Sequence, residues 1–297
     1  MASTAGLEIR DASVLALVAD GEGVVRARAD AAGADLAVTA VKAVERVMAE
    51  ATGAVALGVA TPNPEAPAAA LAIEAIAARF PDLFRSRSAI GSGTAGAIAE
   101  GWVGAARGAG DFAYFAVAEH AMAGIIRDGR PVTGAHGRAP AVAWLSLNPV
   151  EREDYRRSGC LDAEVAGVGI VRRLIWRIKA GDKSNVQNLV NGDLTAITVN
   201  LVLDAARAGD GVSISVMRDT AKYLGMAAAN LVALGDPELL VLGGIMALAT
   251  DLLLEPIRTE LNRRLPASMA GALTIATASI GAEAAALGAA RHVFPST

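Results

Sequence analysis

The sequence predicts an α/β protein in which helices pack on β-sheets. Short apolar segments, several of them next to turn signals, alternate along the chain with longer helical segments. The chain has 297 residues, of which 53% are hydrophobic and 20% charged, and it contains 31 glycines. This length suffices for two domains that each bury a core of their own.

Most of the strand signals lie in the N-terminal half. The segment GEG at 21–23 is a turn signal between residues 13–20 and 24–29, which predicts a β-hairpin. Asp35 is a predicted N-cap, and the apolar spacing after it indicates a helix over 35–51. The other elements predicted in this half are a strand at 54–60 ended by Pro62 and Pro64, an alanine-rich helix, a helix at 94–107, and strands at 112–118 and 123–129.

The C-terminal half is mostly helical, because its apolar residues recur at helical spacing over long stretches. It shows no internal repeat of fixed period and no low-complexity linker. The predicted helices cover 162–179, 194–207, 213–234, 246–264 and 281–292, and the predicted strands cover 238–244 and 273–279.

Composition narrows the classes of function. A net charge of −4 argues against a general binder of nucleic acid or of membrane surfaces. The only cysteine, Cys160, excludes an internal disulfide and is typical of a reducing compartment. The first residues lack the regions of a signal peptide, and the apolar stretch at 270–282 ends at Glu283, short of the roughly 18 residues of a spanning helix. We expect a cytoplasmic protein without a membrane partner.

Six segments along the chain form an ordered set of motifs: AIGSGTAGAIAEGWVGAARG (89–108), GDLTAIT (192–198), AARAGDG (205–211), YLGMAAANLVALGDPELLVLGG (223–244), DLLLEPIRTEL (251–261) and IGAEAAALGAA (280–290). In this order they resemble the ROK family (repressor, open reading frame, kinase). The resemblance implies an actin-like ATPase (ribonuclease H-like) fold, with two α/β domains around a cleft, and a homodimer. It implies a small domain over 1–110 that is closed by the C-terminal helix 281–297, and a larger domain over 111–280 that carries the dimer surface.

The position of the catalytic base is the first departure from the family. In ROK sugar kinases, an aspartate in the segment that matches 89–108 deprotonates the sugar hydroxyl. With the register fixed on Glu100, Gly91 stands at the family's asparagine and Ser92 at the catalytic aspartate. A neutral hydroxyl cannot take a proton at pH 7 as a carboxylate can. The resemblance therefore implies that this chain has no catalytic residue at the expected place.

Both phosphate loops of the family are also changed. The first, asp-ile-gly-gly-thr-lys, matches residues 8–13, and the second, gly-thr-gly-ile-gly, matches residues 118–122. The glycines that let backbone N–H groups approach the phosphates are absent. Asp11 and Glu119 would instead lie where a triphosphate should sit, and like charges ~4 Å apart repel by about 4 kcal/mol at an effective dielectric of 20. We expect no cofactor; ATP and Mg²⁺ would bind only in an active kinase.

Two glycines match the family's adenosine side. Gly243 and Gly244 follow the apolar segment ELLVL. They either contact a nucleotide, as a vestige of the family's site, or simply form a strand-to-helix turn.

The positions that match the family's sugar and zinc sites are also changed. Between Gly58 and Gly91 the chain is shorter than the family pattern by ~10 residues and lacks the sugar-side loop. Residues 140–144 replace gly-glu-ile-gly-his, which removes the sugar-binding glutamate and the zinc histidine. Of three zinc cysteines only Cys160 remains, and one thiolate cannot complete a four-ligand site. We predict no structural zinc. Glu153 and Tyr155 stand at the other two cysteine positions.

The tryptophans and one basic cluster have simpler interpretations. Trp102, Trp144 and Trp176 are expected in core or interface positions, with Trp144 in the volume of the missing zinc histidine. The basic residues of 172–179 predict a solvated helix face, and the alternative is a patch for phosphate or nucleic acid.

These losses favour a sugar kinase-like protein that no longer phosphorylates sugars, a pseudokinase acting as a ligand-binding or regulatory protein. The alternative is an active ATP-dependent sugar kinase that uses Asp11, Glu8 or Glu119 as its base. A third hypothesis is an enzyme of another class built on Glu119 and His120. The expected partners are a second copy of the chain and a small-molecule or sugar ligand. The kinase-like part begins near residue 6, which leaves no room for the DNA-binding domain of ROK repressors, so direct DNA binding is not expected.

Overall fold

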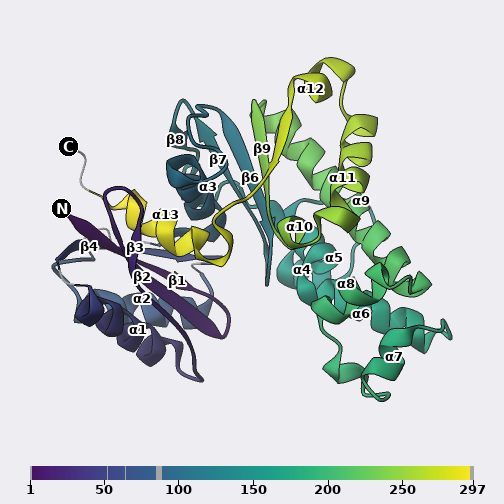
Figure 1. Ribbon diagram of the computed structural model, residues 1–297, viewed down its shortest axis with the longest axis horizontal. Coiled ribbons are helices and arrows are strands. Elements are labelled where there is room, and N and C mark those ends of the chain that lie inside the picture. Colours follow the sequence, from purple (N-terminus) through teal and green to yellow (C-terminus); the bar gives the residue numbers. More distant parts are fainter. Residues whose placement is uncertain (1, 52, 64, 85–88, 295–297) are drawn as a thin grey trace.

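The computed structural model describes residues 2–51, 53–63, 65–84 and 89–294. These residues form two five-stranded sheets, each packed with helices (Figure 1). The sheet of the N-terminal part has the strand order β3-β2-β1-β4-β5, and the second sheet has the order β10-β9-β6-β7-β8. The predicted α/β fold class is confirmed.

The N-terminal sheet is covered on both faces. Helices α1 and α2 pack on one face, and α13 packs on β1, β2 and β4 (Figure 1). The Asp35 side chain accepts the Val38 N–H and caps α1, which confirms the predicted N-cap. Strands β2 and β3 pair antiparallel, which confirms the predicted hairpin. The elements are β1 (Ser3–Ile9), β2 (Ser13–Asp20), β3 (Val25–Ala32), α1 (Leu36–Glu50), β4 (Ala54–Thr61), α2 (Pro67–Arg79), β5 (Ile90–Gly91) and α13 (Ala284–His292).

Strand β1 is an element that the sequence pattern does not predict. It pairs with β2 on one side and with β4 on the other, and residues 4–9 are buried. Gly6 in its middle weakens the strand signal. A Cβ at Gly6 would lie 1.9 Å from the Ala286 carbonyl oxygen, so the glycine is what lets α13 lie directly on the strand.

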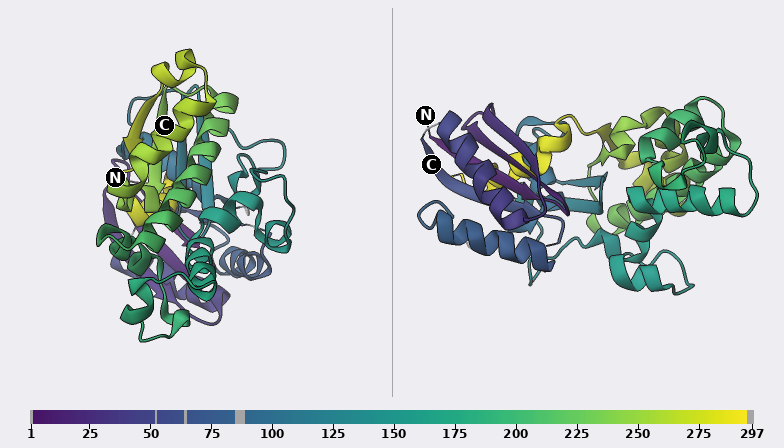
Figure 2. Two further views of the ribbon diagram at one scale, coloured as in Figure 1. Left: turned by 90° about the vertical axis from the view of Figure 1, so that its right-hand side faces the viewer. Right: turned by 90° about the horizontal axis from the view of Figure 1, so that it is seen from below.

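The second sheet lies between two layers of helices. Helix α3 packs on β6 and β7, while α9 packs on β6 from the other face with α11 against it (Figures 1 and 2). The predicted strands of this sheet are confirmed within two residues at each end. Its elements are α3 (Ser92–Val103), β6 (Phe112–Val117), β7 (Ala121–Arg127), β8 (Arg130–Pro131), α9 (Gly211–Gly235), β9 (Leu239–Gly244), α11 (Thr250–Arg264) and β10 (Thr274–Thr277).

Three predicted helices are interrupted by non-helical residues. The helix expected over 194–207 is a 3₁₀ turn at Leu194–Ala196 followed, after Ile197 and Thr198, by α8 from Val199. The helix expected over 162–179 ends at Val165 and restarts at Gly167, because Ala166 has an extended backbone with φ −62° and ψ 158°. The helix expected over 246–264 breaks in the same way at Ala249. The remaining elements are η1 (Val142–Trp144), α4 (Glu153–Ser158), α5 (Cys160–Val165), α6 (Gly167–Lys179), α7 (Asn185–Leu189), η2 (Leu194–Ala196), α8 (Val199–Arg207), α10 (Ile245–Leu248), α12 (Ala267–Ala272) and η3 (Gly281–Glu283).

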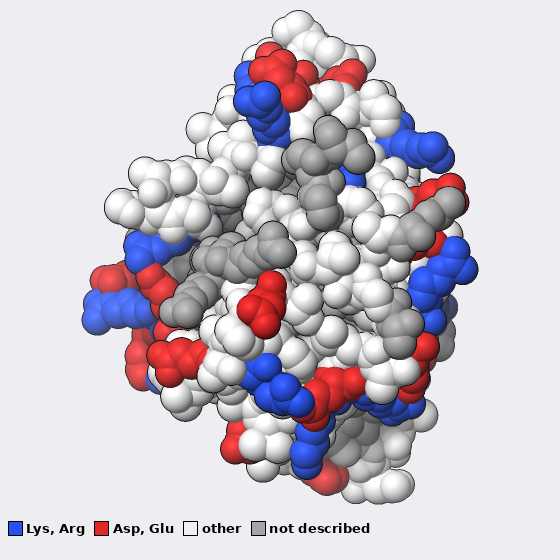
Figure 3. All heavy atoms as spheres, turned by 90° about the vertical axis from the view of Figure 1, so that its left-hand side faces the viewer, with Lys and Arg blue, Asp and Glu red and all other residues white. Residues whose placement is uncertain are grey.

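The surface carries charges of both signs. On the side of the molecule seen in Figure 3, Lys and Arg side chains are interspersed with Asp and Glu. Within the described ranges, no helix is both long enough and apolar enough to cross a membrane.

The two sheets are joined through the packing of α3 and α13. Gly288 of α13 faces the Ala95 carbonyl oxygen of α3, and a Cβ there would lie 1.7 Å from it. Glu100 of α3 is fully buried and accepts the N–H groups of Ser279 and Ile280 at 3.0 and 3.1 Å. These contacts tie α3 to the segment that leads into α13. The domain limits at 110 and 111, and the closing role of 281–297, stay predictions.

Replacing Gly288 by alanine is expected to destabilise the protein, because the added methyl group would push α13 away from a backbone atom that cannot rotate aside. Overpacking of this kind costs typically about 1–3 kcal/mol. Urea denaturation measures the loss. Gly271→Ala is the matched control, since it adds the same methyl group to a helix with nothing within 4 Å. Equal midpoints for the two variants would contradict the close packing.

Candidate functional site

A cavity of about 450 Å³ lies between the two sheets. Its wall is formed by the ends of β1, β6 and β9, the start of α3, part of α8, and residues just before and at the start of α13. Glu8, Ser92, Glu119 and Gly244 all line it, although they lie far apart in the sequence. The structure therefore brings together most of the residues that the sequence singles out.

Ser92 is the first residue of α3, two residues before the start that the sequence predicts. It lines the cavity, and only 1% of its surface is exposed. Its Oγ has no hydrogen-bond partner among the described residues. The residue before it, Gly91, provides no side-chain cap for the helix. The place expected for a catalytic carboxylate thus holds an unpartnered hydroxyl at a helix N-terminus.

The turns that match the two phosphate loops are tied together by a histidine. His120, in the turn between β6 and β7, lies between two carboxylates: its Nε2 is 3.0 Å from Asp11 Oδ2, and its Nδ1 is 3.1 Å from Asp162 Oδ2. Asp11 belongs to the turn between β1 and β2, and Asp162 belongs to α5. We call the contact of these three side chains the His120 bridge. It joins the N-terminal sheet to the second sheet at the two turns that match the phosphate loops.

The charge state of the bridge follows from its geometry. Hydrogen bonding to Asp162, and then to Asp11, raises the pKa of His120 to about 9 against the opposing effect of burial. The imidazole is therefore protonated at neutral pH and donates from both nitrogens. The Asp162 side chain, only 4% exposed, also accepts the Ala121 N–H at 2.6 Å.

The expected repulsion between Asp11 and Glu119 needs a correction. The two residues do meet, but the Asp11 backbone N–H donates to Glu119 Oε2 at 3.3 Å, and the Asp11 carboxylate faces His120. The imidazolium offsets the carboxylate charge that would otherwise repel. His120 also pairs with Asp11 and Asp162 and not with Glu119, which removes the geometric basis for a Glu119–His120 acid–base pair.

At the inner side of the cavity, Glu8 is held by a cation of the chain itself. Arg10 Nε donates to Glu8 Oε2 at 2.8 Å, and its Nη2 donates to the Ala282 carbonyl at 2.9 Å. Across the cavity, burial and then the charges of Glu100 and Glu8 raise the pKa of Tyr114, so its hydroxyl stays neutral. Among the described residues, the Tyr114 hydroxyl has no hydrogen-bond partner.

The glycines on the expected adenosine side are required by close packing. Gly244 has φ 59°, and a Cβ there would lie 1.9 Å from the Val117 carbonyl oxygen. A Cβ at Gly243 would lie 2.8 Å from the Tyr114 hydroxyl oxygen. Both positions thus need glycine for the strand-to-helix turn alone. Gly244 lines the cavity and Gly243 does not.

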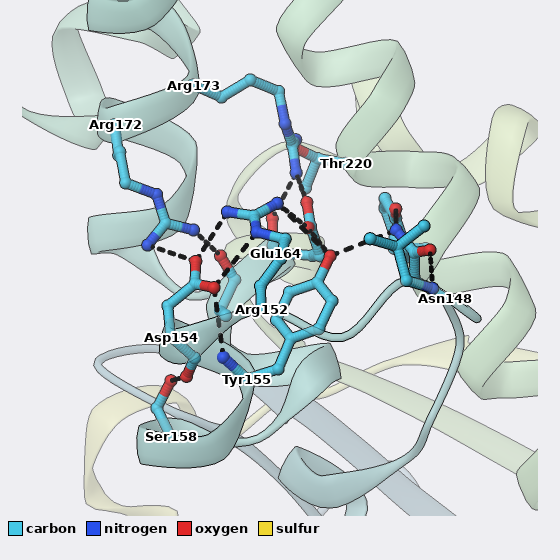
Figure 4. A network of polar contacts seen from close by, with 12 residues as sticks. Asn148, Arg152, Asp154, Tyr155, Ser158, Glu164, Arg172, Arg173 and Thr220 are labelled. Atoms are coloured by element: carbon cyan, nitrogen blue, oxygen red, sulfur yellow. Dashed lines mark hydrogen bonds and ion pairs between the residues drawn. The ribbon is translucent and has the colours of Figure 1, made fainter.

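A polar network occupies the region of the family's zinc motif (Figure 4). At its centre the buried Glu164 carboxylate accepts hydrogen bonds from Tyr155 Oη, Arg152 Nη1 and Arg173 Nη2. Asp154 joins through ion pairs of 2.6 Å to Arg152 and 2.8 Å to Arg172. We call this the Glu164 network. Burial, followed by the hydrogen bond to Glu164, raises the pKa of Tyr155.

The residues at the three cysteine positions do not fit a zinc ion. Glu153 points to solvent and pairs with Arg157 at 2.7 Å, while Tyr155 donates to Glu164. Cys160 is buried at the start of α5. In the described part of the chain, no three His, Cys, Asp or Glu side chains are grouped so that they could hold a metal ion.

Two expectations about neighbouring side chains are wrong. Trp144 and Trp176 are 57% and 52% exposed, so Trp144 does not fill the volume of the missing zinc histidine. The basic helix face is not simply solvated, because Arg173 is 16% exposed and pairs with Glu164. Arg172 and Arg152 lie over the ring of Trp176 at 5.0 and 5.3 Å. The half-buried Asp154 on α4 and the buried Glu164 on α5 attract these cations inward.

Sequence reasoning missed Asp162 and Glu164 as functional neighbours. Both stand in a segment that the apolar pattern predicts as one helix, and their partners His120 and Arg173 come from other elements. The signal that could have found them is that both are acidic residues within the apolar run CLDAEVAGVGI, where a charge requires a partner.

Comparison with known proteins agrees with this geometry. The ROK family model matches residues 59–294. A glucokinase of Halalkalibacterium halodurans is 28% identical over 194 residues, which are 65% of this chain and 58% of the glucokinase. The xylose repressor of Caldicellulosiruptor bescii is 30% identical over 176 residues, which are 57% of this chain and 42% of the repressor. The chain thus spans about half the length of the curated relatives it matches.

Solved structures extend the likeness to the whole fold. A ROK family glucokinase from Streptomyces griseus, solved with glucose and AMPPNP, has a TM-score of 0.82 at 21% identity, with 98% of each chain covered. The ROK hexokinase of Thermus thermophilus has a TM-score of 0.72 at 25% identity, with 97% of each chain covered. The expected actin-like ATPase fold is confirmed.

The His120 bridge predicts a pH-dependent stability. Because the pKa of His120 is raised in the folded state, its contribution to the free energy of unfolding is fully present below about pH 6.5 and is lost as the pH rises through about 9. Urea denaturation over this range is expected to show a falling midpoint. His120→Gln should flatten the fall, whereas His136→Gln, in an exposed loop, should preserve it. A wild-type curve that already matches His120→Gln would contradict the assignment.

The Glu164 network predicts a large cost for removing one charge. Glu164→Gln leaves Arg173 without its buried partner, and breaking a buried pair costs about 3–5 kcal/mol. Urea denaturation should show a strong loss of stability. Glu151→Gln is the matched control, because Glu151 pairs with Arg156 at an exposed position and its loss should leave the midpoint unchanged. Similar midpoints for both variants would show that the network does not hold this region together.

Proposed function

The chain belongs to the ROK family, and we propose that it is a member that has lost sugar phosphorylation and acts as a ligand-binding or regulatory protein. The observation that carries this proposal is the His120 bridge, which joins the two turns between which a triphosphate would have to lie. Phosphoryl transfer depends on holding and neutralising those phosphates. A site in which the protein's own carboxylates and imidazolium pair with one another has few free groups to hold or neutralise those phosphates.

Three further features support the loss of kinase chemistry. Ser92 supplies no carboxylate, and general base catalysis contributes typically about 10²–10⁴-fold. The Glu8 carboxylate is neutralised by Arg10 and therefore has no free charge for a metal ion. The sugar-side positions 140–144 are all apolar, and Val142–Trp144 among them form a short 3₁₀ turn. These changes affect three different parts of the reaction at once.

The retained alternative is an active ATP-dependent sugar kinase with an atypical base. Glu8 and Glu119 line the cavity, which favours them over Asp11, whose carboxylate is held by His120. Glu8 would first have to leave Arg10, and Glu119 would have to leave the Asp11 N–H. ATP and Mg²⁺ belong to this alternative only.

The repressors among the relatives support a role without catalysis. Proteins named glucokinase and proteins named repressor, for xylose and for N-acetylglucosamine, share this family. A small molecule or sugar in the cleft and a second copy of the chain are the partners that we propose. We propose no direct DNA contact by the described residues, since the net charge is −4 and charges of both signs are mixed on the face in Figure 3. A cytoplasmic location belongs to the same proposal.

Calorimetry with Mg·ATP and Mg·ADP tests this function most simply. We expect no binding tighter than about 1 mM and no sugar-dependent release of ADP over a panel of hexoses, pentoses and amino sugars. The glucokinase from Streptomyces griseus serves as the positive control, since it was solved with glucose and AMPPNP. Ser92→Asp should remain inactive, because restoring a carboxylate does not reopen the space between the turns.

Micromolar nucleotide binding together with sugar-dependent ADP release would overturn the proposal. In that case the variants Glu8→Gln and Glu119→Gln would identify the base, because only the variant that lacks the true base would lose sugar-dependent ADP release.

A further inference from the structure

The cavity between the two sheets is large enough for a small organic molecule. Its volume of about 450 Å³ falls within the roughly 300–1,000 Å³ that is usual for ligand pockets. Much of its wall is apolar and comes from the second sheet and from α8 and α10, as in Ala116, Val117, Met122, Leu203 and Ile245. Such a surface favours a ligand that buries apolar area.

Among the described charged side chains that line the cavity, Glu8 and Arg10 neutralise each other, and Glu119 is exposed. Glu8 is paired with Arg10, and Glu119 accepts the Asp11 N–H. A buried ionic ligand group is costly unless it finds a free partner. An anion would in addition face the carboxylates of Glu8 and Glu119. A cation attracted to the exposed Glu119 would stay on the solvent side, so the ligand that fits the apolar part of the cavity is uncharged.

Two hydroxyl groups at the wall lack partners. Ser92 Oγ is buried and has no hydrogen bond, and the Tyr114 hydroxyl likewise has none among the described residues. A buried hydroxyl without a partner is costly, so a ligand oxygen that reaches it is favoured. The uncapped N-terminus of α3, where Ser92 stands, favours an oxygen that accepts.

We infer that this cavity binds an uncharged, largely apolar small molecule that carries one or two hydroxyl or carbonyl oxygens, placed at Ser92 and Tyr114. The inference rests on the proposed function, because it takes the phosphate space to be closed. It goes further by naming the chemistry of the ligand, which is neither a nucleotide nor a free sugar.

A neutral fluorescent ketone, 6-propionyl-2-(dimethylamino)naphthalene, is a suitable probe because it is apolar and has one carbonyl oxygen. With the full chain we expect saturable binding at one site and a blue shift of its emission. The analogue with a carboxylate in place of the propionyl group should not bind, and neither glucose nor Mg·ATP should displace the ketone. Absence of saturable binding, or preference for the carboxylate, would overturn the inference.

Variants locate the probe in the cavity. Ser92→Ala should weaken binding roughly 2- to 10-fold, the effect of one hydrogen bond, and Tyr114→Phe should act in the same direction. Ala247→Trp fills the cavity from α10 and should abolish the blue shift. Ala180→Trp, at the exposed end of α6, is the matched control and should bind as the wild type does. Equal binding by Ala247→Trp and Ala180→Trp would place the probe elsewhere and overturn the inference.

The two proposals fail in different ways. Tight Mg·ATP binding with sugar-dependent ADP release would overturn the proposed function, and the inference with it. Absence of binding by nucleotide and by the neutral ketone alike would overturn the inference alone, because the loss of kinase chemistry would still hold.

Discussion

A protonated histidine held between two aspartates is the contact on which the functional architecture depends. Asp162 is almost completely buried, so its charge requires a partner, and His120 provides it at 3.1 Å. The same ring reaches Asp11 on the other sheet at 3.0 Å. Removing the imidazolium would leave the buried Asp162 carboxylate without a counter-charge, and the Asp11 N–H to Glu119 contact would still lie between the two turns. The bridge therefore couples the charge of Asp162, on the helical side of the second sheet, to the β1–β2 turn of the N-terminal sheet.

The same principle explains the other altered sites. In the segments that match the family's phosphate loops and zinc motif, this chain pairs its own side chains: Arg10 with Glu8, His120 with Asp11, and three donors with Glu164. A buried charge that keeps its partners costs little, whereas one that loses them costs several kcal/mol. The scaffold can thus remain intact without its ligands. The unpartnered hydroxyls of Ser92 and Tyr114 stand apart from this pattern, and both residues line the cavity.

Local patterns in the sequence predicted much of the fold. The hairpin of β2 and β3, the cap at Asp35 and the strands of the second sheet follow from turn residues and apolar spacing within a few positions. Strand β1 was not predicted because Gly6 weakens its strand pattern. The contact that requires this glycine is made by Ala286, far along the chain. The break at Ala166 was missed because apolar spacing continues through it.

The site was predictable only in part, for the same reason. Aligned motifs identified Ser92, Glu8, Asp11 and Glu119, but local spacing cannot show which groups neutralise them. His120 lies 109 positions from Asp11 and 42 from Asp162. Only the folded chain brings these three together.

The nitrogen chemical shifts of the His120 ring, measured by NMR with and without Mg·ATP, test the central claim most directly. The spectra are recorded at a pH between the ordinary histidine pKa of about 6.5 and the raised pKa of His120 of about 9. The bridge predicts a ring protonated on both nitrogens, with shifts that Mg·ATP leaves unchanged. A neutral ring, or a ring whose shifts move as nucleotide saturates the protein, would contradict the closure of the phosphate space.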